Sequence, residues 1–316
     1  MLLRKGDRND NVKKLQKGLN ALGHNSGRPD GIFGNGTEDA VEDFQERNDL
    51  YPDGIFGPAS MEKYDAALLA AGHGDLAFQP PPSKTIDPVE PDDGLMDWVR
   101  VPADKYGNGF DCFQLREDVA EIYRGIYDYV HERGGLITSS GARRPLVTSA
   151  GAGMSRKSFH YVGRALDLNI YSGMQDPVDD PYIVVKVGDT RRWEVWAKVR
   201  NNHVQAPKAH EVEVVTLEAC TWKDGKLRFT KWTGKAINLT KLFMGAGFSR
   251  IRGRKSFFTG GAYIGAEHWH FQYTADLVKG ENTFGEELLK VYSLEEAKQF
   301  VYWEESKDAA YNVSWW

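Results

Sequence analysis

Cysteine is scarce in this chain, and long apolar runs are absent. The 316 residues include two cysteines, Cys112 and Cys220, too few and too far apart for a disulfide framework or a CxxC zinc site. We expect two reduced, buried thiols, with one disulfide between them as the alternative. No run approaches the ~18 apolar residues of a transmembrane helix, so we expect no membrane span.

The chain also lacks the apolar segment of a signal peptide, because MLLRKGDRNDNVKK turns polar after three residues. We therefore expect synthesis in the cytoplasm, with any export by a route that needs no such signal. An excess of positive charge is missing too: 40 basic and 45 acidic residues give a net charge of -5. This balance argues against nucleic acid as a partner. The content of 41% hydrophobic and 12% aromatic residues indicates a folded protein, which we expect to be monomeric.

The first seventy residues contain a short internal repeat. The sequence DGIFG occurs at residues 30–34 and again at 53–57, and each Asp-Gly pair indicates a turn. Apolar residues at helical spacing predict a helix over 12–22, and Thr37 and Ser60 are the expected N-caps of two more. The pattern predicts a small three-helix domain over residues 1–72.

This region resembles the type 1 peptidoglycan-binding domain found on many cell-wall hydrolases. The resemblance is carried by the LQ of the first helix, the DGxFGxxTxxAVxxFQ core and the second DGxxGPxS turn. It implies bacterial peptidoglycan as the partner. The shared positions are mostly turn and core residues, so the pattern does not identify individual wall-binding contacts.

A linker over residues 73–95 and a second domain over 96–316 are expected next. FQPPPSKTIDPVEPDDG is rich in proline and acid and predicts an extended spacer. Beyond it, the pattern predicts helices at 115–131 and 238–246, strands in YIVVKV, HEVEVVTLEACTW and KLRFTKW, and a hairpin turn at 223–225. Thr283/Glu286 and Ser293/Glu296 have capping-box spacing. Strands and helices do not alternate, which favours an α+β fold with a central antiparallel sheet.

The stretch SFHYVGRALDLNIY carries the first chemical signal. Strand alternation places Asp167 on the face opposite Leu166 and Leu168. His160 precedes this strand, beyond Gly163, where the chain can bend back so that the two side chains converge. A histidine and a carboxylate are common ligands of a catalytic zinc, although such a pair is more often simply hydrogen-bonded.

The stretch GAEHWHFQY offers Glu267, His268 and His270. Polar groups in an apolar neighbourhood require partners. As a regular strand, the segment would place His268 and His270 on one face, without Glu267. As a turn leading into a strand, it would bring Glu267 and His270 to one centre. The pattern alone leaves both arrangements open.

Together the motifs SxHxxGxAxD and ExWH resemble those of zinc peptidases of the D-alanyl-D-alanine carboxypeptidase group, which includes phage endopeptidases. The resemblance implies that His160, Asp167 and His270 hold Zn²⁺ and that Glu267 is the catalytic base. The role of His268 stays open.

Two further elements follow from the same resemblance. The family motif SGxR matches residues 140–143 and implies that Arg143 binds or polarises the scissile carbonyl, with the adjacent Arg144 as the alternative. Ser158, in the first motif, is expected to bind substrate. AGFSRI, at residues 246–251, resembles the passage from helix to strand before ExWH. The long segment 172–261 departs from compact members and leaves substrate preference open.

These observations predict a zinc metallopeptidase that acts on peptidoglycan, cleaving a peptide bond of the stem peptide or cross-link. The resemblance suggests a phage endolysin that causes bacterial lysis, with an exported cell-wall-degrading effector as an alternative. An inactive wall-binding protein is another alternative. A glycan-cleaving lysin would need two carboxylates facing each other across a cleft, and no such pair stands out. Which peptide bond is cut stays open.

Overall fold

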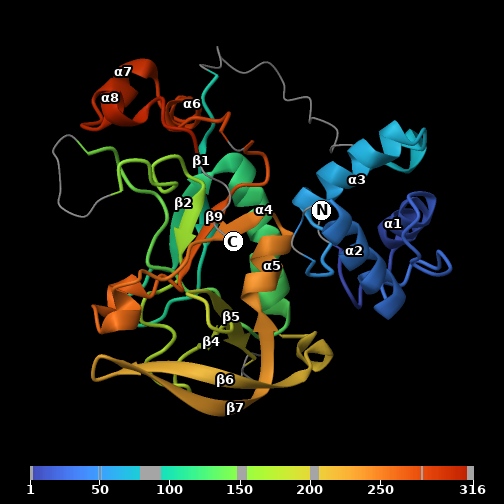
Figure 1. The fold of residues 1–316 in the computed structure, drawn as a ribbon, viewed down its shortest axis with the longest axis horizontal. Helices are drawn as coiled ribbons and strands as arrows, with labels where there is room; N and C mark the ends of the chain where they lie inside the picture. Colours follow the sequence, from blue (N-terminus) through green and yellow to red (C-terminus); the bar gives the residue numbers. More distant parts are fainter. Residues whose placement is uncertain are drawn as a thin grey trace. The chain divides into compact units, whose positions relative to one another are not determined.

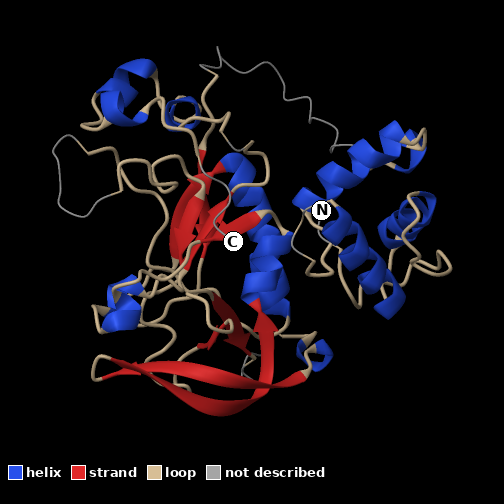
Figure 2. Cartoon of the chain, in the orientation of Figure 1, coloured by secondary structure: helices blue, strands red, loops and turns tan. Residues whose placement is uncertain are grey.

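The computed structural model describes residues 3–48, 50, 52–78, 94–147, 155–199, 206–278 and 280–311. The chain divides into two compact units: Met1–Asp92 with Lys241–Phe248, and Asp93–Thr240 with Ser249–Trp316. Helices at the N-terminus followed by antiparallel sheets and further helices confirm the predicted α+β fold (Figures 1 and 2). The domain boundaries remain predictions, and residues 79–93 of the predicted linker lie outside the described residues.

Three helices build the first unit. They are α1 (Asp10–Ala21), α2 (Asn35–Arg47) and α3 (Pro58–Ala70), followed by the 3-10 turn η1 (Gly74–Leu76). Asn9 caps α1 by accepting a hydrogen bond from the Val12 amide at 3.0 Å. The apolar faces of the helices form one core, which the buried Phe78 completes. Phe78 therefore packs with this unit although it is the first residue of the proline-rich stretch.

Each DGIFG turn is held by a buried glutamine. In the first copy, the Gln16 amide donates to the Asp30 carboxylate, the Ile32 carbonyl and the Thr37 hydroxyl, each at 3.0 Å. The Gln16 Oε1 accepts from the Gly31 amide at 2.9 Å. Because buried amide groups must be paired, this side chain fixes the turn against α1.

The second copy repeats the same arrangement. The Gln45 amide donates to Asp53, to the Ile55 carbonyl and to the Ser60 hydroxyl at 2.8 to 3.0 Å. Its Oε1 accepts from the amides of Asp53 and Gly54, both at 3.0 Å. The internal sequence repeat therefore corresponds to a structural repeat, in which one glutamine holds each turn.

These networks correct the two predicted N-caps. Helix α2 begins at Asn35 after the N-cap Gly34, and α3 begins at Pro58, so Thr37 and Ser60 lie inside their helices. Both hydroxyls accept a hydrogen bond from a glutamine amide of the preceding helix. A turn-adjacent hydroxyl resembles a cap in sequence, but here it pairs with a residue distant in the chain.

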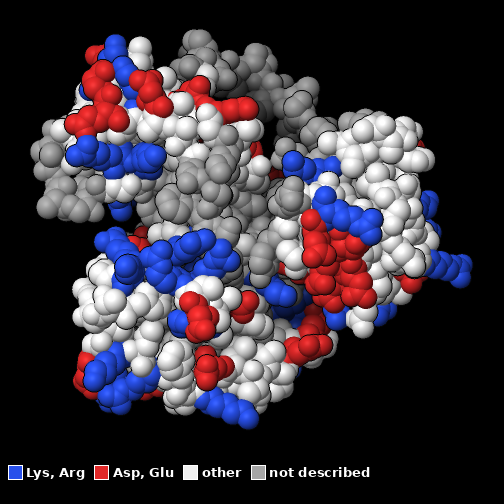
Figure 3. Space-filling model, in the orientation of Figure 1, with Lys and Arg blue, Asp and Glu red and all other residues white. Residues whose placement is uncertain are grey.

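Helix α2 has one apolar and one acidic face. Its buried residues include Ala40, Val41 and Phe44, while its remaining positions carry several acids within the sequence NGTEDAVEDFQER. Figure 3 shows acidic side chains gathered over α2 and basic side chains in a band across the second unit. Such a division is typical of a helix that covers a core on one side and meets water on the other.

Nine strands and five α-helices are described in the remainder of the chain. The strands are β1 (Trp98–Pro102), β2 (Cys112–Arg116), β3 (Ala165–Asp167), β4 (Tyr182–Lys186), β5 (Trp193–Lys198), β6 (Val214–Lys223), β7 (Lys226–Asn238), β8 (Phe248–Arg250) and β9 (His270–Tyr273). The helices are α4 (Glu117–Glu132), α5 (Leu239–Gly245), α6 (Phe284–Leu288), α7 (Leu294–Lys298) and α8 (Trp303–Ser306). Short 3-10 turns lie at η2 (Ala209–Glu211), η3 (Phe257–Thr259) and η4 (Tyr263–Gly265).

The expected antiparallel pairing is present and is divided among three small sheets. Their strand orders are β1-β2, β3-β9-β8 and β4-β5-β7-β6. Helix α4 packs on the first sheet, where the Tyr123 hydroxyl donates to the Pro102 carbonyl at 2.8 Å. The sheet β3-β9-β8 carries Asp167 at the end of β3 and His270 at the start of β9, and the long β6-β7 hairpin extends the third sheet (Figure 1).

Several local signals in the second unit are confirmed. Strands β6 and β7 join at a tight turn in which Asp224 and Gly225 have positive φ angles of 53° and 71°, as an Asp-Gly hairpin requires. Both C-terminal capping boxes are present, at Thr283/Glu286 and Ser293/Glu296. Both cysteines are free; Cys220 is buried as expected, whereas Cys112 is half-buried.

A buried ion network joins the region around β3 to the C-terminal helices. One Glu287 carboxylate oxygen lies 2.8 Å from Arg116 Nη1 and 2.8 Å from Arg164 Nη1, and all three side chains are fully buried. Arg116 also contacts Asp118, and Arg164 contacts Asp276. Burial raises the pKa of Glu287, but the neighbouring cations outweigh it and lower that pKa to about 2.

Candidate metal centre

Strand pairing brings the two motifs together. In the antiparallel register of β3 and β9, Asp167 lies directly opposite His270, although 103 residues separate them in sequence. His160 lies in the turn that precedes β3. Its neighbours Phe159 and Tyr161 are buried in an apolar core with the C-terminal helices, so the backbone that carries His160 is anchored on both sides.

The three side chains converge on one point. Asp167 lies between the imidazoles, with Oδ2 3.3 Å from His160 Nε2 and Oδ1 2.9 Å from His270 Nδ1. One ligand atom from each residue lies within 4.8 Å of the other two. Two imidazoles and one carboxylate are the donor set of a catalytic divalent-metal site. The predicted trio is therefore brought together, and its donor set fits the ion that the resemblance implies.

The outer nitrogen of each imidazole also has a partner. His160 Nδ1 lies 2.5 Å from the Ala142 carbonyl oxygen, and His270 Nε2 lies 3.1 Å from Gln272 Oε1. Such bonds fix the tautomer and orientation of metal-binding histidines. Gln272 was not singled out in the sequence, although its position two residues after His270 in a strand places both on one face.

The electrostatics of the cluster favour a charged carboxylate. Burial alone would raise the pKa of Asp167, but hydrogen bonds and charge from His160 and His270 hold that pKa well below its usual range. Burial would lower the pKa of His270, and the hydrogen bond to Asp167 reverses this, so the pKa is raised. The carboxylate thus stays negative between the two imidazoles.

Residues 140–144 wrap around two of the three cluster residues. The Ser140 amide donates to the Asp167 carbonyl at 2.9 Å, and the Asp167 amide donates to the Gly141 carbonyl at 3.0 Å. The Arg144 amide donates to the His160 carbonyl at 3.1 Å. The main chain of the SGAR motif therefore positions His160 and Asp167, a role that side-chain reasoning missed.

Glu267 occupies a strained position beside the cluster. Its φ angle is 59°, an unusual left-handed conformation for a residue with a side chain. The carboxylate is 13% exposed and accepts a hydrogen bond from Arg254 Nε at 2.8 Å. Its charge contributes to the raised pKa of His270. The segment is therefore a turn that leads into β9, the second of the two arrangements left open by the sequence.

Arg143 and Ser158 make other contacts. The Arg143 guanidinium lies 4.3 Å from the centre of the Trp98 ring, and its Nη1 donates to Gln114 Oε1 at 3.2 Å. Ser158 Oγ accepts a weak bond from the His160 amide at 3.4 Å. Ser158 lies two residues before His160 in sequence, and the contacts of both residues with substrate remain predictions.

His268 does not belong to the cluster. The ring is buried, and within the described residues neither ring nitrogen has a hydrogen-bond partner. Burial, together with the charge of Arg250, lowers the pKa of His268 to about 3. The imidazole is therefore neutral at physiological pH, and we assign it no contact with the trio.

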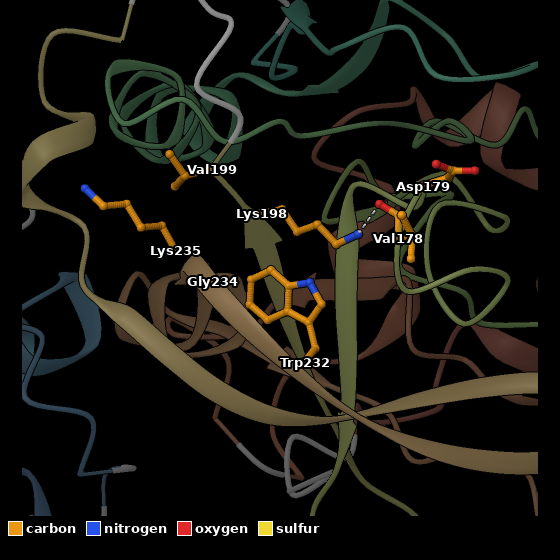
Figure 4. Close-up of a pocket in the computed structure, with 7 residues that line it drawn as sticks. All are labelled: Val178, Asp179, Lys198, Val199, Trp232, Gly234 and Lys235. Carbon is orange, nitrogen blue, oxygen red and sulfur yellow. Dashed lines mark hydrogen bonds between the residues drawn. The ribbon is translucent and has the colours of Figure 1, made fainter.

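A cavity of about 660 Å³ lies elsewhere in the second unit (Figure 4). Lys198 Nζ donates to the carbonyls of Pro177 and Val178 at 2.6 and 3.0 Å, and Lys235 Nζ donates to the Ala209 carbonyl at 2.9 Å. Among the described residues that line the cavity, none belongs to the metal-binding trio. Its lining residues are Val178, Asp179, Lys198, Val199, Trp232, Gly234 and Lys235.

Part of the chain is similar to known proteins. Residues 8–63 match the peptidoglycan binding domain family. A stretch of 64 residues, or 20% of this chain, is 36% identical to a protein named "Probable CtpA-like serine protease" from Staphylococcus saprophyticus. This chain covers 13% of that relative's length. The domain match supports peptidoglycan as a partner and associates the chain with the cell wall.

The same comparison corrects the predicted catalytic type. The named relative is a serine protease, and a serine protease attacks with an activated hydroxyl rather than with metal-activated water. The prediction that this chain is a zinc metallopeptidase is contradicted by that relative. Among the helices that the structure describes, none has the length and apolar character needed to cross a membrane.

Proposed function

We propose that this protein binds peptidoglycan through its N-terminal unit, that it hydrolyses an amide bond of the stem peptide or cross-link, and that the trio His160, Asp167 and His270 holds a divalent cation. The observation that carries the proposal is the convergence of three ligand atoms within 4.8 Å. The orienting bonds to the outer nitrogens of both imidazoles add support. The lytic role, that of a phage endolysin, rests on the sequence resemblance alone.

The trio would hold Zn²⁺ through His160 Nε2, an Asp167 oxygen and His270 Nδ1. A divalent ion held there would supply Lewis-acid activation of water at neutral pH. Glu267 would accept the proton of that water on a carboxylate oxygen and pass it to the leaving amine. Its strained backbone supports this role, because such strain persists where the surrounding structure enforces it and is concentrated at functional sites.

The decisive experiment digests purified peptidoglycan sacculi with the full chain and analyses the released fragments by mass spectrometry. We expect soluble peptide-containing fragments that disappear when a chelator removes the metal and return when Zn²⁺ is added. The variant Glu267→Gln should release none while still binding Zn²⁺. An exposed acid in the same unit, Glu281, provides the matched control Glu281→Gln.

The relative's name favours one competing function, hydrolysis by a serine. Within the described residues, the side-chain bonds of His160 go to Ala142 and Asp167 and not to Ser158. Digestion that survives chelation but stops with a serine-reactive inhibitor would replace the proposed metal-dependent reaction with this one. If the chain binds sacculi but digests them under none of these conditions, it is a wall-binding protein without hydrolytic activity.

A further inference from the structure

Gln272 is buried beside the proposed metal site and has no assigned role. It lies on β9, two residues after His270, and only 3% of the residue is exposed. Its Oε1 lies 3.1 Å from His270 Nε2. Burying an amide in the interior is costly unless its polar atoms are paired, so this side chain is held where it is by its partners.

The other end of the amide is paired as well. Gln272 Nε2 donates to the Ser249 hydroxyl on β8 at 3.4 Å. The backbone of Gln272 lies opposite Ala165 in the register of β3 and β9. With the nitrogen directed to Ser249, the carbonyl oxygen is directed to His270. An amide oxygen only accepts hydrogen bonds, so it pairs with a proton on His270 Nε2.

We propose that Gln272 is a positioning residue that keeps the proton of His270 on Nε2 and leaves the Nδ1 lone pair to bind the metal ion. The inference rests on the proposed function, because it assigns a role within that same site. His270 Nδ1 faces Asp167 at 2.9 Å, so a proton on Nδ1 would stand where the cation must bind. The Gln272 carbonyl opposes that tautomer.

His160 provides an internal comparison. Its outer nitrogen, Nδ1, bonds to the main-chain carbonyl of Ala142 at 2.5 Å, and its Nε2 faces Asp167. The two imidazoles therefore present opposite nitrogens to the carboxylate. One is oriented by a main-chain oxygen that substitution cannot remove. The other is oriented by a side chain, so substitution can test its contribution.

The test compares two variants in the full chain. Gln272→Met keeps the length of the side chain and removes the acceptor, whereas Gln272→Glu keeps an acceptor oxygen. We measure Zn²⁺ affinity by competition with a chromophoric chelator, and the coordination of Co²⁺ by its visible absorption. Loss of an orienting partner typically weakens metal affinity by about 10- to 100-fold. We expect that loss in Gln272→Met and wild-type affinity in Gln272→Glu.

Controls separate positioning from folding. Thermal unfolding in chelator should show that both variants fold, and Gln272→Leu replaces Gln272→Met if the latter does not. Gln299→Met, at an exposed helix end, should leave metal affinity unchanged. The inference would be overturned if Gln272→Met bound Zn²⁺ as tightly as the wild type, or if Gln272→Glu lost as much affinity as Gln272→Met. Either result would leave the proposed function standing. Absence of Zn²⁺ binding by the wild type would overturn both the inference and the metal site of the proposed function.

Discussion

Replacing the buried Glu287 by Gln should destabilise the second unit by about 3 kcal/mol at pH 7. Pairing lowers the pKa of this carboxylate from 4.5 to about 2, and each pKa unit corresponds to about 1.4 kcal/mol. The substitution removes a negative charge between two fully buried guanidinium groups, Arg116 and Arg164. Breaking a buried ion pair typically costs about 3 to 5 kcal/mol, consistent with this value.

The same linkage fixes the dependence on pH. Because the folded pKa lies below the unfolded value, the stabilisation is fully present above pH 4.5 and is lost as the pH falls from 4.5 towards 2. The difference in unfolding free energy between wild type and Glu287→Gln should therefore shrink over that window. Glu281→Gln, at an exposed position nearby, should match the wild type throughout.

Denaturant unfolding followed by tryptophan fluorescence suits this measurement. The first tryptophan of the chain is Trp98, so all of the signal comes from residues beyond the N-terminal helices. A difference below about 1 kcal/mol at pH 7, the range of an exposed ion pair, would refute the reasoning. A larger difference that does not change between pH 7 and pH 3 would refute the assignment to ionised Glu287.

Three further predictions concern single contacts. Gln45→Ala should destabilise the N-terminal unit by about 2 kcal/mol or more, measured by helical circular dichroism, because the amide makes five hydrogen bonds at the second turn. Gly163→Ala should lower stability by about 2 kcal/mol or more in fluorescence-detected unfolding, since φ is 71° and a Cβ would lie 2.7 Å from the Arg116 amide. Asp167→Asn should weaken Zn²⁺ binding at least tenfold in chelator competition while circular dichroism stays unchanged.

Local patterns predicted much of the fold because they depend on neighbours in sequence. The helical spacing before Gly23, the Asp-Gly hairpin turn and both capping boxes are present. The sequence pattern does not reveal strand β5 or the division of the antiparallel strands into three sheets. Which strands pair depends on contacts between distant segments, and alternation of side chains along a strand does not encode them.

The candidate site, too, was predictable only where local sequence determines the geometry. Alternation in ALDLNI placed Asp167 on the correct face, and the trio named from the resemblance converges. The pattern could not choose between a strand and a turn at Glu267, because the choice depends on a positive φ angle. Thr37 and Ser60 resemble helix caps in sequence, and their actual partners, Gln16 and Gln45, lie in other helices that a local pattern does not reveal. Gln272 lies outside the recognised motifs, so the sequence did not indicate a role for it.

The placement of Asp167 opposite His270 has a consequence for how the chain folds. Their juxtaposition requires closure of a loop of more than a hundred residues, and non-local strand pairing of this kind is slow. A slip of one residue in register would turn one ligand to the opposite side of the sheet. Binding of the proposed Zn²⁺ should therefore coincide with a late folding step. It would stabilise only chains in which β3 and β9 are paired in the native register, because a ligand that binds the native state alone shifts the folding equilibrium towards that state.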